Sequence, residues 1–401
     1  MKTNSILILS EYFYPDLNAT GYSMTAIAER LVKGKNNVTV ITASNKHNSL
    51  TNKKIDKKIK IHRLKSLALN KNNFFERFLK LFLMTISFTI KTILNIKKVD
   101  KILIVTNPAF VVLIIPIIKI IKKNIKATVL VHDVFPENLH ASNILKKTSI
   151  FYKFLNYIFN ICYGKFDNII TLGCDMSEIF KSKINPKHHH KIKVITNWSQ
   201  TDDIKPALKK ENPIIKKFKL ENKMVILFAG NMGRLQGIER LIPIISTCSN
   251  EKFHFLFIGD GAILDDLKKE VINNKISNIT FIDGMPRENQ NIFLNACDIG
   301  LVTLSPKMYG LGVPSKSYNI LAAGKPILFI GNPKSEIALM IKSSKTGWVI
   351  GDNDITKIST LLNEIYDQKC IKMFSQQCRK LALSKYSKKI VLDKYYKLIL
   401  K

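Results

Sequence analysis

Residues 308–326 read MYGLGVPSKSYNILAAGKP, and this stretch decides how the second half of the chain is expected to fold. Two glycines flank Leu311, and a Val-Pro step leads to Ser315 and Lys316 at the start of an apolar helix pattern. Ser315 is expected to cap this helix, and the free N–H groups of a helix start beside Lys316 suit a phosphate. By itself, the stretch also fits a tight loop–helix–strand unit of an α/β domain, because Pro326 stops the helix before a short apolar strand.

The composition describes a folded chain that is long enough for two domains. Of its 401 residues, 46% are hydrophobic and 9% aromatic, so each half can bury a core. There are 63 Lys and Arg residues against 30 Asp and Glu residues, and the net charge of +33 favours polyanionic partners. Part of this excess is attributed to an AT-rich genome, which favours Lys, Ile and Asn. The six cysteines are scattered without a CxxC pair and indicate thiols in a reducing compartment.

Strand and helix patterns alternate along the whole chain and predict two Rossmann-like domains. The first domain is expected at 1–198, a Pro-containing, lysine-rich linker at 199–223, the second domain at 224–375 and a long helix at 376–401. Strands of the first domain are expected at 6–10, 38–42, 101–106, 128–137, 168–171 and 192–198. Strands of the second domain are expected at 224–230, 254–259, 279–282, 299–303 and 327–330.

Two apolar segments of the first domain, 73–98 and 107–123, carry lysines within helical patterns. The first is too short and too charged for a confident transmembrane helix, and Pro116 interrupts the second. Two interpretations stay open for 73–98, a basic amphipathic helix on a membrane surface or an internal helix packed on the sheet. The lysine-rich end of the second segment also suits lipid headgroups.

Candidate site residues follow the strands, where open α/β sheets bind their ligands. In the first domain, Gly21 lies in the loop after the first strand, where a glycine lets a ligand approach the backbone. His132 and Asp133 end a later buried strand, although a turn with a capping acid is the alternative there. Three consecutive histidines at 188–190 have no carboxylate or cysteine nearby, so a solvated loop is favoured over a metal site.

The second domain has glycine-rich turns beside cations, which is the chemistry of a phosphate site. GNMGRLQGIERL at 230–241 follows a strand. Its Gly233 permits close approach of a ligand to the backbone, and the Arg234 guanidinium can donate two hydrogen bonds to phosphate oxygens. IGDG at 258–261, which contains Gly259, follows another strand. Together with Lys316, these residues are expected to face the first domain across a cleft.

Three other classes of enzyme lack their motifs in this sequence. There is no GxxxxGK[ST] loop for a Walker-type NTPase, no GxGxxG after the first strand for a dinucleotide oxidoreductase, and no GxSxG for a hydrolase.

The ordered motifs YFYPDLNATGYS, HDVFPE, NW, GNMGRLQGIE and GVPSKSYNILAAGKP resemble a known family across nearly the whole chain. The chain is similar to retaining, nucleotide-sugar-dependent glycosyltransferases of family 4, in particular the bacterial branch with fucosamine and colanic-acid type transferases. The resemblance implies the α/β GT-B fold, with two Rossmann-like domains whose parallel sheets face across a cleft. It also implies that the C-terminal helix returns to the N-terminal domain.

The resemblance assigns roles to individual residues. Gly21 would lie beneath the donor diphosphate, which Arg234 would bind together with Gly233 and Ser315. His132, with Asp133 beside it, falls where the family has a polar residue near the donor sugar and the acceptor.

The nucleoside would be held by Gly259, by the segment 279–286 that includes Met285, and by Asn319. Asn319 stands where many members have a glutamate that binds the ribose hydroxyls, and an asparagine still hydrogen-bonds ribose. The family's first motif glutamate falls at Leu311 or Tyr309, so no role of that acid is transferred.

The lysine that follows the family's arginine is also missing, because Gln236 stands there. The hypothesis is that Lys316 replaces it as the second cation on the diphosphate, so that no metal or other cofactor is needed.

The predicted function is retaining transfer of a sugar from a nucleoside-diphosphate sugar, with UDP preferred, to a polyprenyl-diphosphate-linked saccharide. The product would be O-antigen, capsule or a similar surface polysaccharide. The enzyme would be cytoplasmic and peripherally bound to the inner face of a bacterial membrane. One alternative is a GT-B-fold sugar-nucleotide 2-epimerase, which would require several site carboxylates. The other is a basic nucleic-acid-binding protein, although the lysines are spread widely and no DNA-reading motif is present.

Overall fold

A computed structural model describes residues 3–16, 18–43, 55–65, 74–368 and 370–401. Residue 73 of the expected helix 73–98 lies outside these ranges. The chain forms two compact units. The first unit comprises Met1–Ile195, Gly310–Gly312 and Leu392–Lys401, and the second comprises Thr196–Tyr309 and Val313–Val391.

Within the described residues, the first unit is built on a seven-stranded sheet in which every pair of neighbours is parallel. The strand order is β3-β2-β1-β4-β5-β6-β7, so the order reverses beside β1. The central strands are apolar on both faces, as expected for a sheet covered by helices on both sides. The strands are β1 (Ser5–Ser10), β2 (Asn37–Ala43), β3 (Ile59–Leu64), β4 (Lys101–Val105), β5 (Lys126–Leu130), β6 (Asn168–Thr171) and β7 (Ile192–Val194).

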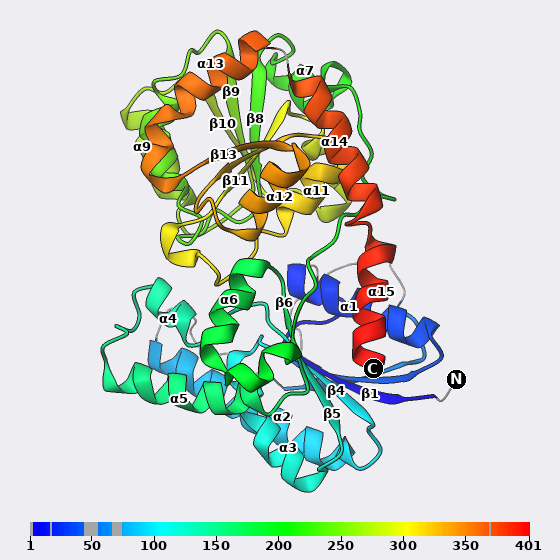
Figure 1. The fold of residues 1–401 in the computed structure, drawn as a ribbon. Coiled ribbons are helices and arrows are strands. Elements are labelled where there is room, and N and C mark those ends of the chain that lie inside the picture. Colours follow the sequence, from blue (N-terminus) through cyan, green and yellow to red (C-terminus); the bar gives the residue numbers. More distant parts are fainter. Residues whose placement is uncertain (1–2, 17, 44–54, 66–73, 369) are drawn as a thin grey trace. The chain divides into compact units, whose positions relative to one another are not determined.

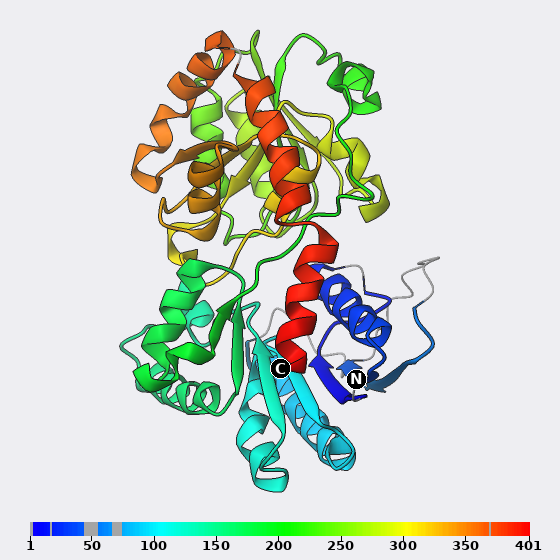
Figure 2. The same ribbon diagram turned by 45° about the vertical axis from the view of Figure 1, so that its right-hand side comes forward.

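The helices of the first unit include one from the far end of the chain. Arg30 on α1 pairs with Asp393 on α15 at 2.7 Å, and the Arg30 guanidinium lies 3.9 Å from the ring centre of Tyr396. The two helices lie side by side in Figures 1 and 2, so the predicted return of the C-terminal helix is confirmed. The helices are α1 (Ala19–Lys33), α2 (Phe74–Ile96), η1 (Ala109–Ile114), α3 (Ile115–Ile121), α4 (Glu137–Ala141), α5 (Ile150–Gly164), α6 (Cys174–Lys183), η2 (Pro186–Lys191) and α15 (Lys388–Leu400).

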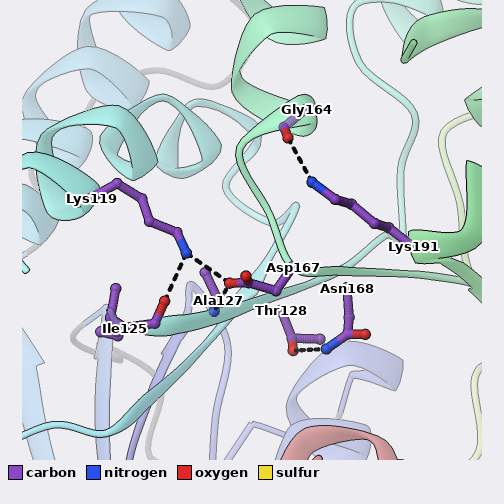
Figure 3. A network of polar contacts seen from close by, with 8 residues as sticks. All are labelled: Lys119, Ile125, Ala127, Thr128, Gly164, Asp167, Asn168 and Lys191. Atoms are coloured by element: carbon purple, nitrogen blue, oxygen red, sulfur yellow. Dashed lines mark hydrogen bonds and ion pairs between the residues drawn. The ribbon is translucent and has the colours of Figure 1, made fainter. Parts of the chain in front are cut away.

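A polar network fastens α3 to the end of the sheet. Figure 3 shows the Lys119 ammonium between the carboxylate of Asp167 and the carbonyl of Ile125, each at 2.7 Å. The same Asp167 oxygen accepts from the backbone N–H of Ala127 at 2.7 Å. One carboxylate thus joins α3, the start of β5 and the start of β6, which fixes the direction in which α3 lies.

Within the described residues, the second unit is built on a six-stranded sheet with the order β10-β9-β8-β11-β12-β13, again parallel throughout. Its order reverses beside β8, and large apolar side chains of β8, β9 and β11 form the centre of its core. The strands are β8 (Met224–Ala229), β9 (Phe253–Ile258), β10 (Ile279–Ile282), β11 (Ile299–Thr303), β12 (Ile327–Ile330) and β13 (Gly347–Ile350).

The stretch 199–223, which was expected to be a linker, lies within the second unit. Lys209 pairs with Asp298 at 2.6 Å, and the Asn212 side chain donates to the Ile292 carbonyl at 2.7 Å. The expected helix 376–401 consists of two helices, α14 and α15. The second unit's helices are η3 (Lys209–Glu211), α7 (Pro213–Phe218), η4 (Ile238–Leu241), α8 (Ile242–Ile245), α9 (Leu264–Asn273), η5 (Arg287–Asn289), α10 (Gln290–Leu294), η6 (Pro306–Met308), α11 (Lys316–Ala322), α12 (Glu336–Ser344), η7 (Asp352–Lys357), α13 (Ile358–Gln368) and α14 (Ile371–Ser384).

Candidate functional site

Two glycine-rich turns touch each other at the carboxyl ends of β8 and β9. Gly230 has a φ of +131° and Gly259 a φ of +143°, and both values disfavour any residue with a side chain. A Cβ on Gly259 would lie 2.1 Å from the Gly230 carbonyl oxygen, and one on Gly261 would lie 2.2 Å from the Met232 carbonyl oxygen. The glycines therefore allow two backbones to meet beside the strand-order reversal, where such sheets bind ligands.

Lys316 places a buried cation against this glycine turn. Its Nζ lies 3.3 Å from the ring centre of Phe228 and 3.4 Å from the position of a Cβ on Gly230. Part of the side chain is exposed, but the Nζ itself is buried and has no hydrogen-bond partner among the described residues. Attraction to the Phe228 ring offsets part of the cost of burying the charge. Buried ammonium groups almost always have a hydrogen-bond partner, so the unsatisfied Nζ of Lys316 is a candidate contact for an anion.

Burial lowers the pKa of Lys316 from 10.5 to about 7. Between these two pH values the unfolded chain holds a proton on Lys316 that the folded chain has lost, so stability rises with pH across this window. Below about pH 7 both states are charged, and the folded protein bears the full cost of burying the cation.

We therefore expect Lys316→Met to raise the melting temperature at pH 6 and to raise it less at pH 9. Scanning calorimetry of both proteins without ligand measures this difference. A difference that stays constant from pH 6 to pH 9 would show that Lys316 does not titrate in this range.

Of the predicted diphosphate contacts Arg234 and Ser315, one differs from the sequence expectation. Arg234 is exposed on the turn after Gly233, where it is available to solvent and to a ligand. Ser315 occupies the N-cap position of α11, but its side chain makes no capping hydrogen bond. Its backbone is already helical, with φ −63° and ψ −22°, whereas a capping side chain needs an extended backbone. The predicted cap is therefore wrong.

Asn319 lies inside the second unit and is 8% exposed. Its amide oxygen accepts from the backbone N–H of Gln200 at 3.0 Å, and its amide nitrogen donates to Gln290 at 3.3 Å. Both polar atoms of the Asn319 side chain are therefore hydrogen-bonded within the protein. The ribose role of Asn319 stays a prediction. The same is true of the nucleoside roles of Gly259 and of Met285, which is half-buried after β10.

His132 lies in a second cluster, at the carboxyl ends of β1, β4 and β5. Its Nδ1 is 3.2 Å from the Thr20 hydroxyl on α1. The backbone N–H groups of His132 and Asp133 both donate to the Thr106 hydroxyl, at 3.0 and 3.1 Å. Burial lowers the pKa of His132 to about 4, so the imidazole is neutral at pH 7. Thr20 and Thr106 were missed by the sequence reasoning, since nothing in their spacing links them to His132.

Burial raises the pKa of Asp133, and its hydrogen bond from Asn138 at 3.0 Å partly opposes that shift. Gly21 lies in the first turn of α1 and not in a loop, because Asn18 caps the helix by accepting from the Gly21 N–H at 2.8 Å. A Cβ at Gly21 would lie 2.7 Å from the Cβ of Asp16. Packing against Asp16 therefore explains this glycine, and its diphosphate role stays a prediction.

The predicted site residues fall into two sets, one on each unit. Gly21, His132 and Asp133 belong to the first unit, and the remaining predicted residues belong to the second. That the two sets face one another stays a prediction. In the described parts of the chain, no three His, Cys, Asp or Glu side chains gather as metal ligands would. Of the histidines at 188–190, His189 and His190 lie within 3.0 Å of backbone carbonyl oxygens.

Comparisons with known proteins agree on one class of enzyme. The family model for glycosyl transferases group 1 matches residues 210–384. WbjE of Pseudomonas aeruginosa, named as a probable glycosyltransferase, is 33% identical over 392 residues, which cover 97% of this chain and 96% of WbjE. WcaI of Escherichia coli (strain K12), named for colanic acid biosynthesis, is 26% identical over 123 residues, which cover 31% of this chain and 30% of WcaI.

The architecture also matches a solved structure over its full length. Anabaena Alr3699/HepE in complex with UDP-glucose has a TM-score of 0.72 at 13% identity, covering 99% of each chain. At this identity the likeness concerns the fold alone. The expected two-domain architecture with parallel sheets is confirmed.

Proposed function

The chain belongs to the group 1 glycosyl transferases, and on that basis we propose that it moves a sugar, with retention, from a UDP-sugar to a lipid-linked saccharide. The product of this transfer would be a surface polysaccharide, the class for which WcaI is named. Because the chain belongs to this family, we propose glycosyl transfer as its primary function, in place of the epimerase and nucleic-acid-binding alternatives.

The observation that carries the donor side of this proposal is the buried ammonium of Lys316, which lies beside the Gly230 turn and has no hydrogen-bond partner within the described residues. A leaving diphosphate gains negative charge in the transition state, and a fixed cation in a site shielded from water stabilises that charge strongly. Arg234, exposed on the same turn, would add a bidentate contact. These two cations would stabilise the negative charge on the diphosphate, which a divalent metal ion does in other enzymes. UDP is preferred because HepE, which shares the fold, was solved with UDP-glucose.

The acceptor side of the proposal rests on the first unit. The acceptor hydroxyl would attack from the face that the diphosphate leaves, and the leaving phosphate would take its proton. The neutral imidazole of His132, oriented by Thr20, would position the sugar or the acceptor hydroxyl beside Asp133. A lipid-linked acceptor places the enzyme at the inner face of the cell membrane, which is also a proposal.

We expect a UDP-sugar at about 100 times its Kd to stabilise the protein by about 2.7 kcal/mol, and we expect Arg234→Ala to abolish this effect. The measurement is thermal unfolding in EDTA with UDP-, GDP- and ADP-sugars and with the free nucleoside diphosphates. Lys269→Ala is the matched control, because it removes an exposed cation from α9 in the same unit.

Three outcomes of this experiment bear on the donor site. A stabilisation restricted to one nucleotide class names the base of the donor. Full stabilisation of the Arg234→Ala protein would remove that residue from the site. No stabilisation by any nucleotide would remove the main support for a nucleotide-sugar donor.

A further inference from the structure

Exposed apolar side chains concentrate on three helices of the first unit. Of the 23 large hydrophobic side chains that are exposed among the described residues, 14 lie on α2, α3 and α5. Those of the second unit are scattered over separate elements, as is normal for a soluble surface. The 14 residues are Leu79, Phe82, Ile86, Ile90, Ile93, Leu94, Ile117, Ile120, Ile121, Ile150, Phe151, Phe154, Tyr157 and Ile161. We call them the apolar face.

The position of α2 rules out a membrane-spanning role for this helix in the folded unit. Leu79–Ile96 is long and apolar enough to cross a bilayer, and only 22% of that segment is buried. However, Met84, Phe88 and Ile96 lie at helical spacing on its buried side, against the first unit's own core. A helix that is packed along one side cannot be surrounded by lipid, so its other side is available to lie on a surface.

The three helices form one layer on the sheet. Both α2 and α5 pack against η1, and α3 continues directly from η1. The Lys119–Asp167 pair, shown in Figure 3, anchors α3 to the sheet. The next residue, Ile120, is 84% exposed. On α5, exposed residues recur at Ile150, Phe154, Tyr157 and Ile161, which is the spacing of one helical stripe. The three helices are labelled in Figure 1.

The charge around the apolar face is mostly positive, although Glu76 lies on α2, Asp100 follows it and Asp167 pairs with Lys119 on α3. Residues 79–99, 101–132 and 138–166, which contain nearly all of these helices and their flanking turns, include no Asp or Glu. They carry lysines instead, of which Lys97, Lys98, Lys123, Lys126, Lys146, Lys147, Lys153 and Lys165 are exposed. An apolar stripe bordered by lysines is typical of helices that lie in the headgroup region of anionic membranes.

We propose that the apolar face is a membrane-docking surface, on which α2, α3 and α5 lie in the headgroup region of an anionic bilayer. The proposal deepens the proposed function, because a lipid-linked acceptor requires the enzyme to reach a bilayer. A second copy of the chain is a poor occupant of this face, since two lysine-bordered surfaces repel each other.

Vesicle co-sedimentation of the full chain, without donor or acceptor, tests the proposal. We expect binding to phosphatidylcholine vesicles that contain about one third phosphatidylglycerol, and weak binding to pure phosphatidylcholine. Leu94→Ser and Phe154→Ser are each expected to weaken binding about tenfold. Ile272→Ser is the matched control, because Ile272 on α9 of the second unit is 73% exposed and Leu94 is 74% exposed.

The outcomes separate this proposal from the proposed function. Nucleotide stabilisation is measured on the same variants, so a protein that binds nucleotide but not vesicles overturns only the docking surface. Equal loss of binding in Ile272→Ser, or equal binding to neutral vesicles, would also overturn it. So would a dimer, detected by sedimentation velocity, that dissociates in Phe154→Ser, because the face would then be an interface between copies.

Discussion

Lys316→Met is expected to lower kcat/KM for the nucleotide-sugar donor by about 10²–10³-fold. Methionine keeps most of the volume of the lysine side chain and its contact with the Phe228 ring, but it carries no charge to meet a developing diphosphate. The loss should fall mainly on kcat, because the interaction grows as the leaving group gains negative charge. Steady-state kinetics with the donor identified by thermal unfolding measures this effect.

This loss is distinguishable from a folding defect because the two effects have opposite signs. The buried ammonium has no hydrogen-bond partner among the residues that the structure describes, so its removal should stabilise the protein without ligand. A less active Lys316→Met protein should therefore melt at a higher temperature. Lys342→Met, which removes an exposed cation from α12, should leave both activity and stability unchanged. Full donor affinity and full kcat in Lys316→Met would remove Lys316 from the diphosphate site and leave Arg234 as its proposed cation.

Most of the fold could be predicted because buried parallel strands are short apolar runs that end at turn residues. This signal located β1, β2, β4, β6 and β8 to β12 within a few residues. It also located β5 and β7, but these strands end at Leu130 and Val194, before the expected ends at 137 and 198. The two missed strands lie at the edges of their sheets. β3 reads IKIHRL and buries only its first residue, and β13 has four residues and begins at Gly347 with a φ of +148°. Edge strands lack the burial that produces an apolar run.

The sequence predicted which residue types form the candidate site better than it predicted their contacts. The Gly230 turn and Lys316 were recognised because glycines and cations at strand ends are a local pattern. The contact of Thr20 with His132 joins residues 112 positions apart, so no spacing rule could find it. The Ser315 cap failed for a local reason, since the sequence does not show that its backbone is already helical. The need for glycine at position 21 comes from its close contact with Asp16, which the sequence does not reveal.

Gly259→Ala is expected to destabilise the second unit by about 3 kcal/mol, which lowers its melting temperature by about 10 °C. The new Cβ would lie 2.1 Å from the carbonyl oxygen of Gly230 and 2.9 Å from its carbonyl carbon, and the φ of +143° is strained for alanine. These are backbone atoms, which cannot swing away as the end of a side chain can. Either the Gly230 turn moves or the two strands separate.

The matched control is Gly164→Ala at the end of α5, where a Cβ meets nothing within 4 Å. We expect that protein to melt at or slightly above the temperature of the unaltered chain, since alanine favours a helix over glycine. Scanning calorimetry of both variants, with and without the donor nucleotide, gives the comparison. Because Gly230 also borders the Lys316 Nζ, a shift of its turn in Gly259→Ala should weaken donor binding as well as stability. Lost stability with unchanged nucleotide affinity would show that the meeting of the two backbones is structural only, and would place the diphosphate away from the Gly230 turn.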